Sequence, residues 1–200
     1  MTTPQHRLCV YCGSGPGKNP AYLTAADELG RSMAKAGIGL VYGGGGTGLM
    51  GQVARGVLAG GGHVTGIIPD FLVQRERMLE GVNELIVTRS MHERKTAMFE
   101  QSTGFVALPG GMGTLEELAE ISTWAQLGQH AKPIIVANIE GYWDPLLALL
   151  AHMRSENFIR EGMEVLLDVA SGISDIVPLY RHRLENAHNL VPVHMIKDKL

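Results

Sequence analysis

The clearest structural signal in the chain is the stretch Phe105-Val106-Ala107-Leu108-Pro109-Gly110-Gly111-Met112-Gly113-Thr114-Leu115-Glu116-Glu117. Its first four residues are apolar and predict a buried strand, and the residues after Thr114 follow a helical pattern. Glycines therefore lie where a strand turns into a helix. Glycine lets backbone N–H groups approach a ligand closely, and the first turn of a helix has free N–H donors and the positive end of a dipole. The stretch predicts an anion site.

Two carboxylates, Glu116 and Glu117, follow this turn. The helix dipole favours acidic side chains in a first turn, so the pair has a purely structural interpretation. Beside a bound phosphate, however, a carboxylate is repelled unless it takes part in the chemistry. At this point the sequence leaves both interpretations open.

The pattern of strand, glycine turn and helix also occurs at two earlier places, where apolar runs 8–12 and 39–42 precede glycine turns 13–17 and 43–51. Other apolar runs predict strands at 63–68, 84–88 and 133–137, and residues 165–168 are a short strand or a connector. Helices are predicted at 20–36, 91–101, 144–154 and 174–185. Two more follow the glycine turns at 43–51 and 109–117 and end at about 59 and about 127. The excursion 70–81 is predicted to contain at most a short helix.

The predicted strands are continuous apolar runs and alternate with helices. This combination indicates an α/β protein, with a Rossmann-like doubly wound parallel sheet in a single domain over residues 1–185 and a C-terminal tail over 186–200. In such folds ligands bind beyond the carboxyl ends of the strands. We therefore expect one crevice to be faced by Ser14, by the turn that contains Gly44 and Gly45, by the Arg94 helix and by the turn that begins at Gly110.

Composition excludes several classes of function. The 200 residues are 45% hydrophobic, with a formal net charge of −3, so nucleic acid is not an expected partner. No apolar run reaches the ~18 residues of a membrane span, and no signal-peptide pattern is present, so we expect a cytoplasmic protein without membrane contact. Cys9 and Cys12 lie in a predicted strand and are expected to be buried thiols, and His92 and His130 lack metal-ligand spacing, so no metal is expected.

The glycine turns suit a small phosphate or a nucleoside monophosphate bound by backbone amides. Turn 43–51 lacks the acidic residue of the dinucleotide fingerprint, and no glycine loop continues into Gly-Lys-Ser/Thr as a P-loop does. In the helix that Ser90 and Glu93 are expected to cap, Arg94 and Lys95 are cations in a first turn, where the dipole disfavours them. A phosphate or an acidic side chain would explain both.

A carboxylate, an arginine and amide-lined turns are a set that suits cleavage of an N-glycosidic bond. The ribosyl cation that develops in this reaction needs a nearby carboxylate, and the attacking water needs orienting. On the residues alone, this chemistry is one option among several.

Four motifs carry a family likeness: PGGMGTLEE at 109–117, GGGGTGLMG at 43–51, MHERK at 91–95 and WAQLG at 124–128. In this order, over roughly residues 8–160, they resemble the Lonely Guy (LOG) family of cytokinin riboside 5′-monophosphate phosphoribohydrolases, whose members were often mislabelled lysine decarboxylases. The resemblance implies a Rossmann-like homodimer. It also implies hydrolysis of N6-modified AMP to the free base and ribose 5-phosphate, with no metal or redox cofactor.

The resemblance also assigns roles to residues. Arg94 and Glu117 are implied to be the catalytic pair. The residues implied to line the nucleotide site are Glu76, Lys95, Gly111, Met112, Gly113, Thr114, Leu115, Glu116 and Thr123. Glu76 rests only on its spacing from Arg94. The hydrolase hypothesis therefore depends on Glu117. Glu116 is interpreted as a first-turn residue with no assigned chemistry.

Two other functions remain as alternatives. One is an AMP nucleosidase with little preference at N6. The other is a non-catalytic carrier of a nucleotide or of molybdenum cofactor, which would not need the Arg94 and Glu117 pair. Lysine decarboxylation is disfavoured, because it normally needs a pyridoxal-phosphate lysine and the sequence offers no setting for one.

Overall fold

Strands and helices alternate along the chain in the computed structural model, which describes residues 4–73, 77–164 and 166–186. The strands are β1 (Arg7–Tyr11), β2 (Gly39–Tyr42), β3 (Val64–Pro69), β4 (Glu84–Thr88), β5 (Gly104–Ala107), β6 (Ile134–Ala137) and β7 (Asp168–Ala170). The helices are α1 (Ala21–Lys35), α2 (Gly48–Ala59), α3 (Asp70–Val73), α4 (Met91–Glu100), α5 (Met112–Gln126), the 3-10 turn η1 (Ile139–Gly141), α6 (Asp144–Ser155) and α7 (Ile173–Asn186).

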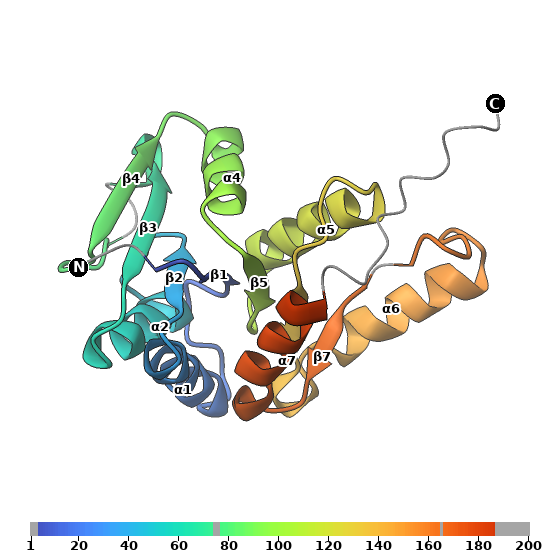
Figure 1. Cartoon of the computed structure of the whole chain (residues 1–200), viewed down its shortest axis with the longest axis horizontal. Coiled ribbons are helices and arrows are strands. Elements are labelled where there is room, and N and C mark those ends of the chain that lie inside the picture. The colour runs from blue at the N-terminus through green and yellow to red at the C-terminus, as the bar shows by residue number, and fades with distance from the viewer. Residues whose placement is uncertain (1–3, 74–76, 165, 187–200) are drawn as a thin grey trace.

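The strands form one parallel sheet in the order β4-β3-β2-β1-β5-β6-β7 (Figure 1). The chain runs outward from β1 to β4 and then returns to place β5 on the other side of β1, where Leu8 pairs with Gly104 and Tyr11 with Ala107. The direction of winding therefore reverses between β1 and β5. This reversal opens a crevice at the carboxyl ends of the central strands, the usual ligand site of such folds.

Helices cover both faces of the sheet, which confirms the predicted doubly wound architecture. One buried cluster joins the sheet to α1, α2 and α7, and a second joins its opposite face to α4, α5 and the first turn of α6. Figure 1 shows α1, α2 and α7 below the sheet and α4 and α5 above it. Cys9 packs in the second cluster and Cys12 in the first, and both are buried free thiols, as expected.

The observed elements begin and end within about two residues of the predicted ones, with two differences. The last strand, β7, comes at Asp168–Ala170 rather than at 165–168. More consequentially, α5 begins at Met112 with Gly111 as its N-cap, so no acidic residue lies in its first turn. The expectation that Glu116 and Glu117 are first-turn residues was therefore wrong, and the dipole does not explain them. Residues 187–200 of the expected tail lie outside the described residues.

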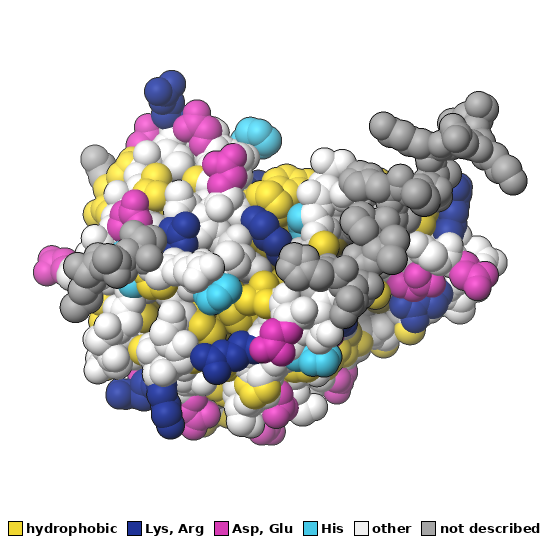
Figure 2. Space-filling view, viewed as in Figure 1, with side chains coloured by type: hydrophobic (Ala, Val, Ile, Leu, Met, Phe, Trp, Pro, Cys, Tyr) yellow, Lys and Arg dark blue, Asp and Glu magenta, His cyan; other side chains and the backbone are white. Residues whose placement is uncertain are grey.

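On the face that Figure 2 presents, Lys and Arg side chains are interspersed with Asp and Glu rather than gathered into one basic patch. In the part of the chain that the structure describes, no helix combines the length and the apolar character that a membrane span requires.

Close packing of α1 on α2 depends on Gly30. A Cβ at this position would lie 2.3 Å from the carbonyl O of Val53 and 2.8 Å from the amide N of Val57. We expect Gly30→Ala to lower the free energy of unfolding by about 1–3 kcal/mol, because the two helix backbones must move apart. Chemical denaturation measures this loss. Gly15→Ala is the control, since no atom lies within 4 Å of its Cβ; equal stability of the two variants would contradict the packing argument.

Candidate active site

Three turns meet at Gly13, at the carboxyl ends of β1, β2 and β5. The Gly13 N–H donates to the carbonyl O of Pro109 at 3.0 Å, and the Gly13 carbonyl accepts from the N–H of Leu49 at 3.1 Å. Glycine is needed where these turns touch. A Cβ on Gly48 would lie 2.3 Å from the carbonyl O of Ser14, and one on Gly110 would lie 2.9 Å from the amide N of Gly13. The turns thus pack backbone against backbone.

The two helices that start at this junction differ in how their first N–H groups are satisfied. The Gly13 carbonyl accepts from Leu49 and Met50, so it caps α2. At α5, the N–H groups of residues 111–114 have no acceptor among the described residues, and Gly111 offers no side-chain cap. The first free donors of a helix attract anions. The start of α5 therefore offers the free donors that the predicted anion site requires.

The other glycine turn is closed by the chain itself. Gly44 and Gly45 are buried, and Gly45 forms a bridge with Met78. The Gly46 N–H donates to Arg77 O at 2.6 Å. This arrangement explains the glycines by internal packing and gives no support to the expectation that this turn also holds a phosphate. Ser14 is exposed, and its carbonyl accepts from the Thr47 hydroxyl at 3.1 Å.

Arg94 is buried, with only 7% of its surface exposed, at the start of α4. Its Nε donates to Ile67 O at 3.2 Å and its Nη2 to Gly43 O at 3.3 Å, so the guanidinium spans the carboxyl ends of β3 and β2. Gly43 leaves the space for it, since a Cβ there would lie 2.1 Å from Nη2. Ser90 caps the helix by accepting from the Glu93 N–H at 3.1 Å, as predicted. Strand-end carbonyls therefore offset the unfavourable dipole at Arg94.

Lys95 and Glu116 pair with each other between α4 and α5. The Lys95 ammonium lies 2.5 Å from Glu116 Oε1 and 3.0 Å from Glu120 Oε1. The hydrogen bond to Glu116 raises the pKa of Lys95. The Glu116 side chain is 51% exposed. The ion pair gives Glu116 a structural role that differs from the predicted first-turn role, and it gives Lys95 an acidic partner in its own chain.

Glu117 is in a different environment, although it is the next residue. It is partly buried and forms no ion pair with any residue that the structure describes. Burial raises the pKa of Glu117 to about 7, and the charge of Arg94 partly opposes this rise. A carboxylate with a pKa near neutrality, close to a helix start with free N–H donors, is a candidate for proton transfer.

The remaining predicted residues are placed as follows. Thr114 is buried one helical turn before Glu117, and Met112 is 78% exposed at the mouth of the turn. The Leu115 side chain packs into the core rather than toward the crevice. Thr123 lies about 14 Å beyond Thr114 along α5, and its hydroxyl donates to Ala119 O at 2.8 Å. The structure thus does not bring Thr123 to the turn, and Glu76 lies outside the described residues.

Gly13 and Tyr142 are residues of this junction that the predicted site did not include, whereas Gly43 belongs to a turn that was expected to face the crevice. Gly13 and Gly43 stand in glycine turns that the sequence did mark, each directly after a strand. Tyr142 follows η1, and its hydroxyl donates to Gly110 O at 2.5 Å. No pattern in the sequence indicates this contact, because its acceptor is a backbone carbonyl 32 residues earlier in the chain.

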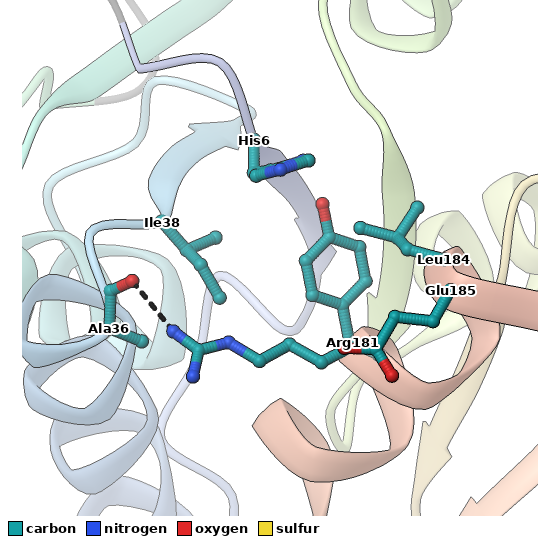
Figure 3. Close-up of a pocket in the computed structure, with 7 residues that line it drawn as sticks. His6, Ala36, Ile38, Arg181, Leu184 and Glu185 are labelled. Carbon is teal, nitrogen blue, oxygen red and sulfur yellow. Dashed lines mark hydrogen bonds between the residues drawn. The ribbon is translucent and has the colours of Figure 1, made fainter.

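A second hollow, the amino-end cavity, lies at the other end of the sheet (Figure 3). It has a volume of about 460 Å³ and is lined by His6, Ala36, Ile38, Tyr180, Arg181, Leu184 and Glu185. Arg181 closes one side by donating to Ala36 O at 3.1 Å. Because His6 and Ile38 precede β1 and β2, this cavity is at the amino ends of the strands, away from the glycine turns. It is not the candidate active site.

Burial of Glu117 predicts a pH-dependent stability. Below its ordinary pKa of 4.5 the residue is protonated in both states, whereas between 4.5 and about 7 the folded state keeps a proton that the unfolded state loses. The contribution of Glu117 to stability therefore falls as pH rises through this window. Relative to the parent protein, Glu117→Gln should gain about 1–3 kcal/mol of unfolding free energy between pH 5 and pH 8. Urea denaturation at both pH values measures it. A stability difference that does not change with pH would refute the buried-carboxylate assignment.

Comparison with known proteins places the chain among its relatives. Residues 50–179 match the family model described as "Possible lysine decarboxylase". The chain is 47% identical over 171 residues to a probable cytokinin riboside 5′-monophosphate phosphoribohydrolase of Oryza sativa subsp. japonica, covering 86% of this chain and 70% of that protein. It is 49% identical over 171 residues to a cytokinin riboside 5′-monophosphate phosphoribohydrolase of Arabidopsis thaliana, covering 86% and 79%.

Solved structures support the fold. The molybdenum cofactor binding protein from Rippkaea orientalis superposes with a TM-score of 0.68 at 24% identity, over 92% of this chain and 99% of that one. At this identity the likeness concerns the fold alone. The sequence relatives go further, because they match at nearly half of all positions over most of both chains. The chain therefore belongs to the Lonely Guy family of cytokinin riboside 5′-monophosphate phosphoribohydrolases.

Proposed function

We propose that the protein hydrolyses the N-glycosidic bond of AMP or N6-modified AMP, releasing the free base and ribose 5-phosphate. The observation that carries this proposal is Glu117, a partly buried carboxylate with a pKa of about 7, set one turn beyond the uncapped start of α5. The names of the relatives supply the substrate class. The reaction consumes one water and calls on no other co-reactant.

The 5′-phosphate binds at the N-terminus of α5. The N–H groups of Gly111, Gly113 and Thr114 have no acceptor among the described residues, and the dipole favours negative charge beside them. A Cβ at Gly111 or Gly113 would meet no atom within 4 Å, so the space beside these amides is open to a ligand. The phosphate thereby completes the cap that the described residues do not provide.

Glu117 faces the ribose. Thr114 and Glu117 are three residues apart and lie on the same face of α5, about 4.5 Å apart along the axis. This separation is similar to the span from the 5′-phosphate to C1′. The C1′–N9 bond breaks with its electron pair going to the base, and ionised Glu117 stabilises the cation that develops at C1′. Water forms the new C1′–O bond and gives its proton to Glu117, from which the departing base can be protonated.

Arg94 supplies a positive charge and N–H donors to the crevice. Three of its donor atoms are engaged by Ile67 O, Gly43 O and the Met91 sulfur, which leaves two of the five guanidinium N–H groups for a ligand. Its charge lowers the pKa of Glu117 against the larger effect of burial. At neutral pH a substantial fraction of Glu117 is therefore ionised and ready for the reaction.

Substitution of Glu117 tests this chemistry. Glu117→Gln keeps the shape of the side chain but cannot carry a negative charge or take the proton of water, so we expect kcat to fall on the order of 10²-fold or more. Release of base from AMP and from N6-isopentenyl-AMP measures it, and the ratio of kcat/KM for the two substrates shows the preference at N6. Glu116→Gln is the matched control. Its carboxylate is already paired with Lys95, so this variant should stay far more active than Glu117→Gln.

Two outcomes would contradict the proposal. If the parent protein released no more base than Glu117→Gln from either nucleotide, the hydrolase function would be wrong. If Glu116→Gln lost as much activity as Glu117→Gln, the division of roles between the two acids would be wrong.

We also propose that the chain forms a homodimer through α6. Although this helix is rich in leucine, none of its residues is buried within the single chain. Leu149 is 47% exposed and Met153, one turn later, is 37% exposed. Phe158, just beyond the helix, is 84% exposed. Exposed apolar side chains gathered on one helix and the turn after it are typical of a protein interface, and a second copy of this chain is the occupant that the family resemblance implies.

Leu149→Glu should convert the dimer to a monomer, because the charge would be buried without a partner. Multi-angle light scattering at micromolar concentration measures the mass. Ala151→Glu is the control, since Ala151 is exposed and lies about 160° from Leu149 around the helix. Dimer retention in Leu149→Glu, or a monomeric parent protein, would exclude α6 as the interface.

A further inference from the structure

Tyr142 joins the turn after β6 to the turn after β5. Its hydroxyl donates to the carbonyl O of Gly110 at 2.5 Å, directly before the N-cap of α5. It is 36% exposed, so the link lies at the surface of the junction rather than in the core. The hydroxyl has no other hydrogen-bond partner among the described residues. This contact acts on the backbone of the proposed phosphate site.

Peptide geometry gives the contact a directional effect. The Gly110 carbonyl and the Gly111 N–H belong to one planar trans peptide, in which the C=O and N–H bonds point in opposite directions. Holding the carbonyl toward Tyr142 therefore turns the Gly111 N–H away from Tyr142. Both residues are glycines, which rotate about their backbone bonds at low steric cost, so without such a link this peptide could flip.

The ring that carries the hydroxyl is itself fixed. It packs edge-on against Trp143, with centroids 5.0 Å apart, and against Tyr22, with centroids 5.5 Å apart. The following backbone is held by Asn138, whose side-chain oxygen accepts from the Trp143 N–H at 2.7 Å. Tyr142 is thus a rigid support, in which a change of the hydroxyl alone leaves the ring in place.

We propose that Tyr142 is a positioning residue that orients the Gly111 amide toward the 5′-phosphate of the substrate. The proposal rests on the proposed function for the identity of the ligand. Tyr142 touches neither the base nor the ribose in this account. Its removal weakens binding of the phosphate and leaves the chemical step at Glu117 intact.

Tyr142→Phe removes only the hydroxyl and is compared with Tyr22→Phe, which removes a hydroxyl that donates to no described acceptor in the same aromatic group. We expect Tyr142→Phe to raise KM for AMP about fivefold, as loss of one oriented hydrogen bond does, and to leave kcat within about twofold. The inhibition constant of inorganic phosphate should rise in parallel. Tyr22→Phe should change none of these values, and thermal unfolding verifies that both variants are folded.

Calorimetric titration of AMP into the Glu117→Gln background, with and without Tyr142→Phe, measures binding without turnover and separates the two claims. Weaker AMP binding with Tyr142→Phe supports the inference, even if the parent protein proved inactive as a hydrolase. Equal affinity for AMP and for phosphate with and without the hydroxyl would overturn the inference while leaving the hydrolase function standing. A fall in kcat with KM unchanged would also overturn it, because positioning of the phosphate amide predicts the reverse.

Discussion

Direct backbone packing among three glycine turns is the constraint on which the site depends. Gly13 hydrogen-bonds to Pro109 on one side and to Leu49 on the other, and Gly48 and Gly110 have no room for a side chain. One consequence is that α2 is capped from within the protein. The other is that the first N–H groups of α5 have no acceptor among the described residues. The same contacts that fix the junction therefore select which helix can take an anion.

Electrostatics then divides the two adjacent acids. Glu116 is exposed and paired with Lys95, whereas Glu117 is partly buried, and its raised pKa reflects the cost of holding a charge there. In the proposed reaction, this charge stabilises the cation that develops at C1′. Arg94, held by the carbonyls at the ends of β2 and β3, keeps the pKa of Glu117 from rising further.

The doubly wound sheet and the positions of its glycine turns could be predicted from the sequence. Buried parallel strands appear in the sequence as apolar runs, and each glycine turn follows one of these runs. The sequence did not predict the helix start at Met112. The hydrogen bond from the Gly13 N–H to the Pro109 carbonyl, rather than local propensity, sets where α5 begins. The partners of Arg94 could not be predicted either, because they are backbone carbonyls on other strands. We also predicted phosphate binding at turn 43–51 from its glycines. In the structure, residues 77–79 form backbone hydrogen bonds with that turn, a contact between distant segments that local sequence does not indicate.

The central claim is that the phosphate caps α5 while Glu117 faces the ribose. A crystal structure of the Glu117→Gln variant with bound AMP tests it most directly, because the substrate should persist uncleaved. The account predicts phosphate oxygens within hydrogen-bond distance of the amides of Gly111, Gly113 and Thr114, and C1′ beside residue 117. A phosphate bound at Gly44 and Gly45, or AMP bound in the amino-end cavity, would contradict it.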